Sequence, residues 1–210
     1  MNDPGTAAPV AVESSGARGD ATGVYYGAII RNDGPETLFE VAVGVDLTAG
    51  SGGDVIGAGR PLVDSVPGIA PGTTVVVGGA ATDTDCGCDP RRVEGVVFRV
   101  DPAFTDDGDP GQLILVEDAS IERRAGRPVA VTATLVNRGP REVRPRGTLW
   151  SAHMAFLDDA GEVVAGDFEA SDARGPIEPG DSLELRVRVE PPLADVLGGD
   201  AASVEVGVWG

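Results

Sequence analysis

Apolar and polar residues alternate along several short stretches of the chain, most clearly near its end. There Leu183, Leu185, Val187 and Val189 alternate with charged residues, which is typical of a strand with one buried face. Similar runs predict strands at 9–14, 24–30, 38–47, 73–77, 95–100, 113–118, 129–135, 150–156 and 203–209. Helical periodicity is limited to one turn at 193–197. The pattern therefore predicts an all-β protein.

The same turn motif occurs in both halves of the chain. Residues 29–35, IIRNDGP, correspond to residues 135–140, LVNRGP, so Asn32 and Asn137 lie half the chain length apart. An Asn at a strand end can bond its own backbone, a Gly can adopt a positive φ, and a Pro fixes the exit of the chain. The repeat predicts two similar domains.

A Pro-Gly pair follows later in each half, at Pro71-Gly72 and Pro179-Gly180. Such a pair suits the central positions of a type II turn, so a strand is expected directly after it. Because strands and turns follow the spacing of a sandwich, we predict two tandem immunoglobulin-like (fibronectin III-like) antiparallel β-sandwiches. The predicted boundaries are a flexible tail at 1–7, a first sandwich at 8–103, an acidic Gly/Pro linker at 104–112 and a second sandwich at 113–210.

Three stretches of the second half carry a family resemblance: VTATLVNRGP, AFLDDAGEVVAG and PIEPGDSLELRVRV. With AIIRNDGPETLFEVAVGV and GIAPGTTVVV in the first half, they resemble the bacterial immunoglobulin-like modules known as FxLYD and CARDB (cell-adhesion-related) domains. The resemblance covers nearly all of both halves. It implies extracytoplasmic, non-enzymatic domains, often attached to an anchor or to a larger protein.

The charge of the chain restricts its partners. Acidic residues number 34 against 16 basic ones, and the net charge is −18. Every basic residue is Arg, and no basic stripe is present to neutralise phosphates, so nucleic acid and anionic membrane surfaces are poor partners. A protein partner or another component of the cell envelope is expected instead.

No apolar run approaches the roughly 18 residues of a membrane helix, which predicts no direct membrane insertion. The first residues lack the basic and apolar regions of a signal peptide. We expect that a leader or anchor was removed and that the protein works in the cell envelope, with the cytoplasm as the alternative.

The segment Cys86-Gly87-Cys88 is the place where reactive groups crowd together. Three interpretations stay open: a local disulfide, free thiols in a loop, and a soft-metal or redox site. A closed zinc site needs four ligands, whereas the sequence supplies two thiols here. The second half has no counterpart, so the fold itself does not require the cysteines.

The predicted linker contains Asp106, Asp107 and Asp109, with Asp101 nearby. Carboxylates of this kind can bind calcium and stiffen a domain junction. The spacing of an EF-hand is missing, so a solvated acidic linker is the alternative.

A group of arginines surrounds the Asn turn of the second half: Arg138, Arg141, Arg144 and Arg146, with Arg123, Arg124 and Arg127 as additional candidates. The planar guanidinium suits carboxylates, so this surface could dock an acidic partner or another copy of the chain. Local charge balance in an acidic protein is the alternative.

The single histidine, His153, lies opposite Trp150 and Met154 in its predicted strand and so faces solvent or a domain contact. No hydrolase elbow, phosphate loop or zinc-protease motif accompanies it. Trp150 and Trp209 are expected in or near the core. The sequence thus predicts a non-enzymatic extracytoplasmic interaction or structural module. The alternatives are a metal-binding or redox protein centred on the Cys86-Gly87-Cys88 loop, and an enzyme with a site between the domains.

Overall fold

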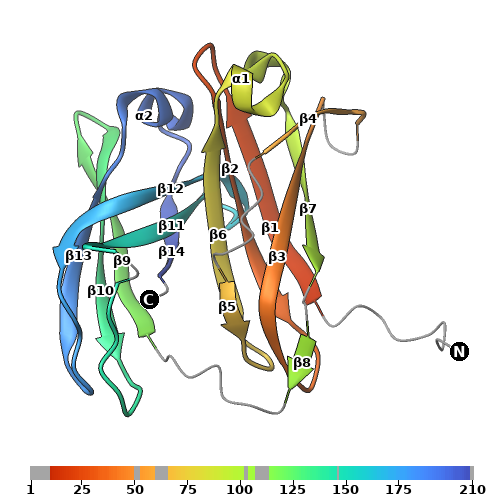
Figure 1. Ribbon diagram of the computed structural model, residues 1–210. Coiled ribbons are helices and arrows are strands. Elements are labelled where there is room, and N and C mark those ends of the chain that lie inside the picture. The colour runs from red at the N-terminus through yellow and green to blue at the C-terminus, as the bar shows by residue number, and fades with distance from the viewer. Residues whose placement is uncertain are drawn as a thin grey trace, which may run out of the picture.

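The computed structural model describes residues 10–49, 53–59, 66–101, 104–106, 114–145 and 147–208. These residues form antiparallel sheets with two short α-helices, which confirms the predicted all-β sandwich class (Figure 1). The first half contains β1 (Val10–Gly19), β2 (Val24–Asn32), β3 (Thr37–Thr48), β4 (Val55–Ala58), β5 (Val66–Ile69), β6 (Thr74–Ala81), α1 (Asp83–Cys86), the 3-10 helix η1 (Pro90–Arg92), β7 (Gly95–Asp101) and β8 (Phe104–Asp106). The second half contains β9 (Ile114–Arg124), β10 (Arg127–Asn137), β11 (Leu149–Leu157), β12 (Val163–Arg174), β13 (Ser182–Arg188), α2 (Pro191–Leu197) and β14 (Ser203–Gly207).

The first half is built from two facing sheets. One has the order β1-β2-β6, and the other is formed around β3, which pairs with β4, β5, β7 and β8. Alternation along β3 buries Val41, Val43 and Val45, which pack in one cluster with Tyr26 and Ile30 of β2. This cluster is the core of the first half.

The second half repeats the two-sheet plan. Its sheets have the orders β13-β10-β9 and β12-β11-β14. Trp150, Met154 and Phe156 of β11 are fully buried and cluster with Leu185 and Val187 of β13. The prediction that Trp150 lies in the core is confirmed, whereas Trp209 lies outside the described residues.

The Asn turns of the two halves have matching hydrogen bonds. The Asn32 side chain donates to the Glu36 and Ile69 carbonyls, both at 2.8 Å, and accepts from the Gly34 N–H at 2.8 Å. Both Asn32 and Asn137 are fully buried.

The Asn137 side chain makes the corresponding bonds to Arg141, Ile177 and Gly139 at 2.7, 2.8 and 2.9 Å. In each half the backbone carbonyl of the Asn also accepts a hydrogen bond from the N–H of the Gly in the Pro-Gly turn, at 2.8 Å. Gly72 and Gly180 have φ of 70° and 84°, as a type II turn requires. The repeated sequence motif therefore marks a repeated structural joint.

The four sheets are stacked, with β1-β2-β6 of the first half facing β12-β11-β14 of the second. Val76, Ala155, Leu157 and Val163 form a third buried cluster between these two sheets. In Figure 1, β11 and β12 run across the direction of β2 and β6. The two inner sheets therefore pack face to face with crossed strands.

Strands β4 and β5 and helix α1 were not predicted from the sequence, and two further features differ from the prediction. Residues 104–106, placed in the linker, form β8 and pair with β3. The long strand β12 occupies a segment for which no strand was predicted. Ala165, Gly166 and Asp167 in its first part are all buried, which removes the alternation that marks a strand with one exposed face.

Candidate functional site

A row of three glycines crosses the inner sheet of the first half. Gly27 of β2 is paired with Gly16 of β1 on one side and with Gly78 of β6 on the other. Glycine in a strand interior removes the side chain and permits close approach of another backbone. The row therefore forms a shallow trough at right angles to the strands.

Strand β12 of the second half lies in this trough. A Cβ built on Gly16 or Gly78 would come within 3.0 Å of the carbonyl oxygens of Val163 and Asp167, respectively. A Cβ on Gly27 would lie 3.0 Å from the Gly166 Cα. Any side chain at these positions would push the two backbones apart.

His153 of β11 lies in the same contact, with an exposed fraction of 1%. Its Nδ1 is 2.9 Å from the Gly78 carbonyl oxygen and 3.2 Å from the Gly78 nitrogen. The first contact needs a proton on Nδ1 and the second needs a bare Nδ1, so the tautomer decides which bond forms. Burial lowers the pKa of His153 to about 4, and the bond to Gly78 opposes that shift. Of the two predicted locations, solvent and a domain contact, the structure has the domain contact.

Asp167 of β12 is the buried carboxylate of the described part of the chain. Burial raises its pKa to about 6, the Phe168 N–H donates to it at 2.8 Å and opposes the shift, and repulsion from Glu169 and Glu190 adds to it. Titratable groups with strongly shifted pKa values are candidates for a catalytic site. His153 is enclosed where the two halves pack together, whereas Asp167 is paired with Met154, whose side chain belongs to the core of the second half.

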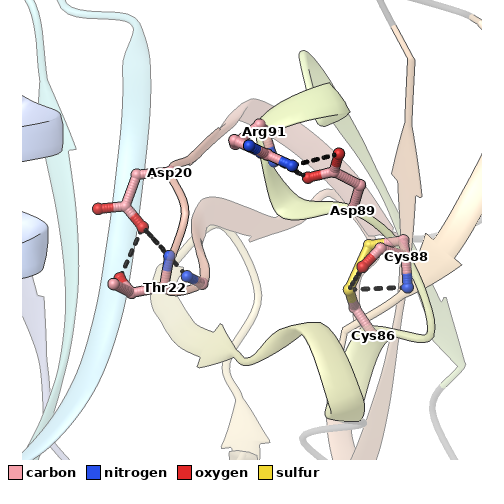
Figure 2. A network of polar contacts seen from close by, with 7 residues as sticks. Asp20, Thr22, Cys86, Cys88, Asp89 and Arg91 are labelled. Carbon is pink, nitrogen blue, oxygen red and sulfur yellow. Dashed lines mark hydrogen bonds and ion pairs between the residues drawn. A yellow bond between two sulfur atoms is a disulfide. The ribbon is translucent and has the colours of Figure 1, made fainter.

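The cysteine segment continues from α1 at one end of the first half (Figure 1), and Figure 2 shows it from close by. Cys86 and Cys88 are joined as a disulfide with a Cα–Cα distance of 5.3 Å, and the Cys88 N–H points at the Cys86 sulfur at 3.2 Å. Cys86 is buried in the core cluster, and Cys88 is half-buried beside it. A Cβ on Gly57 of β4 would lie 2.9 Å from the Cys88 sulfur, so the disulfide packs against this short strand.

Polar groups around the disulfide bond to one another. Thr82 caps α1 through a capping box with Asp85. Asp89 accepts two bonds from the Arg91 guanidinium, at 3.0 and 3.1 Å, which lower the pKa of Asp89, as Figure 2 shows. Asp20 on the neighbouring turn accepts from the Thr22 backbone at 2.6 Å. These hydrogen bonds stabilise the turns on either side of the disulfide.

Of the candidate metal ligands, Cys86, Cys88, Asp101 and Asp106 lie within the described residues. Within the described residues no group of three or more His, Cys, Asp or Glu side chains is placed to hold a metal ion. Asp107 and Asp109 lie outside the described residues, Asp106 is the last residue of β8, and Asp101 is the last residue of β7.

The arginines of the Asn turn have mostly local acidic partners. Arg138 pairs with Glu117 at 3.1 Å, and Arg144 pairs with Glu142. The Glu142 contact raises the pKa of Arg144. Arg141 is exposed, and Arg146 lies outside the described residues. These pairs match the interpretation as local charge balance.

The other arginines lie at the opposite end of β10. Arg124 ends β9 and Arg127 begins β10, whereas Arg138 follows the end of that strand. The sequence suggested one arginine surface, but the structure has two, separated by the length of a strand.

Sequence reasoning missed the glycine trough and Asp167. The sequence signal for the trough was a glycine inside each of the strands β1, β2 and β6, since a glycine in a strand indicates either a bulge or a close backbone contact.

No protein-family model matches the chain, and a search of the curated proteins finds no match. None of the helices in the described ranges is long and apolar enough to cross a membrane.

Proposed function

We propose that the chain is a non-enzymatic interaction module, a pair of immunoglobulin-like sandwiches held in one fixed orientation outside the cytoplasm. The observation that carries the proposal is the seating of β12 in the glycine trough. A contact of backbone against backbone leaves little freedom for the halves to rotate, because interiors of this density do not deform continuously. A rigid pair presents outer sheets, edges and end loops at fixed distances.

The placement of the titratable groups supports a binding role over catalysis. His153 and Asp167 have exposed fractions of 1% and 4%. A general acid or base must come within hydrogen-bonding reach of a substrate. In this chain both side chains are buried, and His153 contacts Gly78 of the opposite sheet, so neither group is placed to reach a substrate.

Three further observations favour a protein partner in the envelope. The disulfide suits an oxidising compartment. The net charge of −18 disfavours nucleic acid and anionic lipid. The resemblance to FxLYD and CARDB modules points to the same setting, as a property of those families.

Partner capture with mapping of the bound surface tests this function. The tagged chain is incubated with envelope and cytosolic fractions, and a recovered partner is then titrated while hydrogen exchange is followed. We expect an envelope partner that protects outer strands or end loops. Equal recovery from the cytosol, or catalytic turnover that is lost in a His153→Gln variant, would contradict the proposal.

A second candidate is thiol-disulfide chemistry at Cys86 and Cys88. It is favoured by the half-buried Cys88, which lines a surface cavity of about 450 Å³ with Asp83, Asp89 and Arg92. Titration of the disulfide against a glutathione buffer distinguishes the two roles. A structural bridge is expected to have a potential below about −300 mV, whereas a regulatory or catalytic one lies higher.

A further inference from the structure

The hairpin between β9 and β10 brings two arginines side by side. Its turn residues, Ala125 and Gly126, have φ of 51° and 82°, as a two-residue type I′ turn requires. Arg124 and Arg127 flank this turn and are directly paired across the strands. Like charges placed opposite one another destabilise a hairpin, so local folding does not explain this pair.

A cavity of about 430 Å³ lies beside the hairpin. Arg124, Arg127 and Arg188 line it together with aliphatic residues that include Pro128, Val129 and Pro191. Asp195 also lines it, so the site combines three arginine side chains and one carboxylate with an apolar lining.

The charge here differs from that of the rest of the chain, in which acidic residues outnumber basic ones by 34 to 16. Arg127 pairs with Asp195 at 2.7 Å and Arg188 with Glu190 at 3.6 Å, but all four side chains are about half exposed or more. Exposed pairs contribute little. Arg124 makes no ion pair with any residue that the structure describes. The site keeps an excess of positive charge.

We propose that this arginine cavity, formed by Arg124, Arg127, Arg188, Pro128, Val129 and Pro191, binds an acidic peptide segment of a partner protein. The carboxylates meet the guanidinium groups, and an apolar side chain of the same segment enters the aliphatic lining. The proposal rests on the proposed function and names the chemistry of the partner. Arg is suited to the role because its fork binds carboxylates through two parallel hydrogen bonds.

The apolar lining of the cavity favours an acidic peptide over simpler anions as its ligand. Inorganic phosphate or an acidic sugar would use the arginines and leave the lining exposed to water. A peptide in which acidic and apolar residues alternate satisfies both parts. A second copy of the chain also offers acidic surface and is therefore an outcome that the test must distinguish.

Fluorescence anisotropy with a short labelled peptide of alternating Glu and Leu tests the proposal on the full chain. Two further probes, alternating Glu and Ser and alternating Gln and Leu, separate charge from apolar burial. The variant is Arg124→Glu. Its matched control is Arg141→Glu, which makes the same charge change at the far end of β10.

We expect Arg124→Glu to weaken binding of the Glu-Leu peptide by about tenfold or more, and Arg141→Glu to leave it within about twofold. The same Arg124→Glu change is expected to raise Tm by about 1 to 3 °C, because it converts a like-charge pair into an opposite-charge pair. Lost binding together with gained stability rules out misfolding as the cause.

Three results would overturn the proposal. One is equal weakening by both variants, and another is equal affinity for the Glu-Ser and Glu-Leu peptides. The third is concentration-dependent self-association that Arg124→Glu abolishes, which would assign the cavity to a second copy. If the partner found by capture still binds the Arg124→Glu variant, the interaction function stands and the cavity assignment fails.

Discussion

The two halves of the chain share one joint and differ in the face that each presents to the other. In the first half, Gly16, Gly27 and Gly78 form a row across β1, β2 and β6. The matching row in the second half crosses β9, β10 and β13 and consists of Ser120, Thr132 and Arg186. The Ser120 and Thr132 hydroxyls bond to each other at 2.9 Å on an open surface.

This difference explains how two similar sandwiches can pack face to face. The glycine row receives the backbone of β12, whereas side chains fill the matching surface of the second half. The second half contributes instead what enters the trough: β12 itself and His153. The two halves therefore share the Asn joint and differ in the residues on the matching sheet faces.

Exchanging residues between the rows tests this comparison most strongly. Gly27→Thr puts into the trough the residue that the second half carries, and its side chain would meet Gly166, whose Cα is 3.0 Å from the position of the Cβ. We expect a loss of about 3 kcal/mol or more in the free energy of unfolding, measured by urea denaturation.

The reciprocal change Thr132→Gly serves as its control and is expected to cost about 1 kcal/mol, because it removes an open side chain from a strand. Equal losses in the two variants would show that the trough does not set the contact between the halves.

The shared joint gives the second prediction. Asn32→Ala and Asn137→Ala each remove three side-chain hydrogen bonds and leave buried carbonyls without that donor. We expect each variant to lose about 2 to 3 kcal/mol of stability. Similar losses support equivalence of the two joints, while a large loss in one half alone would contradict it.

Much of this architecture could be predicted from the sequence, because apolar and polar residues alternate in strands that have one solvent-exposed face. The β13 strand, the Asn turns and the Pro-Gly turns are cases in which local chemistry fixes the structure. Strand β12 was missed where Ala165, Gly166 and Asp167 are all buried, since burial of both faces removes the period-two signal. The arginine cavity depends on Arg188, which comes from another strand, and no local pattern indicates that contact.

The buried titratable groups Asp167 and His153 give the third prediction, which concerns the pH dependence of stability. Between pH values of 3.8 and about 6 the folded state holds the Asp167 proton more tightly than the unfolded state, so this group makes stability fall as pH rises. His153 has the opposite sign, because its pKa falls from 6.5 to about 4 and the folded state binds fewer protons. The two effects oppose each other in the native chain.

Single variants separate these effects in urea denaturation from about pH 5 to about pH 6.5, above the pI of about 4.2. The quantity compared is the free energy of unfolding of each variant minus that of the native chain. As pH rises over this range, we expect this difference to increase by about 1.5 kcal/mol for Asp167→Asn and to decrease by a similar amount for His153→Gln. Slopes of the same sign in both variants would contradict the assignment.

The smallest effect concerns two connections, from β6 to β7 in the first half and from β13 to β14 in the second. In the second half α2 buries Leu193, Ala194 and Leu197, whereas α1 in the first half buries Cys86 alone and is followed by the disulfide. A bridge that closes so short a loop restricts the unfolded chain little, by about 1.6 kcal/mol at most in the chain-entropy account. We therefore expect the double variant Cys86→Ser, Cys88→Ser to lose about 1 kcal/mol, measured against Leu193→Ala, which should lose about 3 kcal/mol through its cavity. A loss from the cysteine variant as large as that from Leu193→Ala would mean that the disulfide anchors its connection as fully as the apolar side chains of α2 anchor theirs.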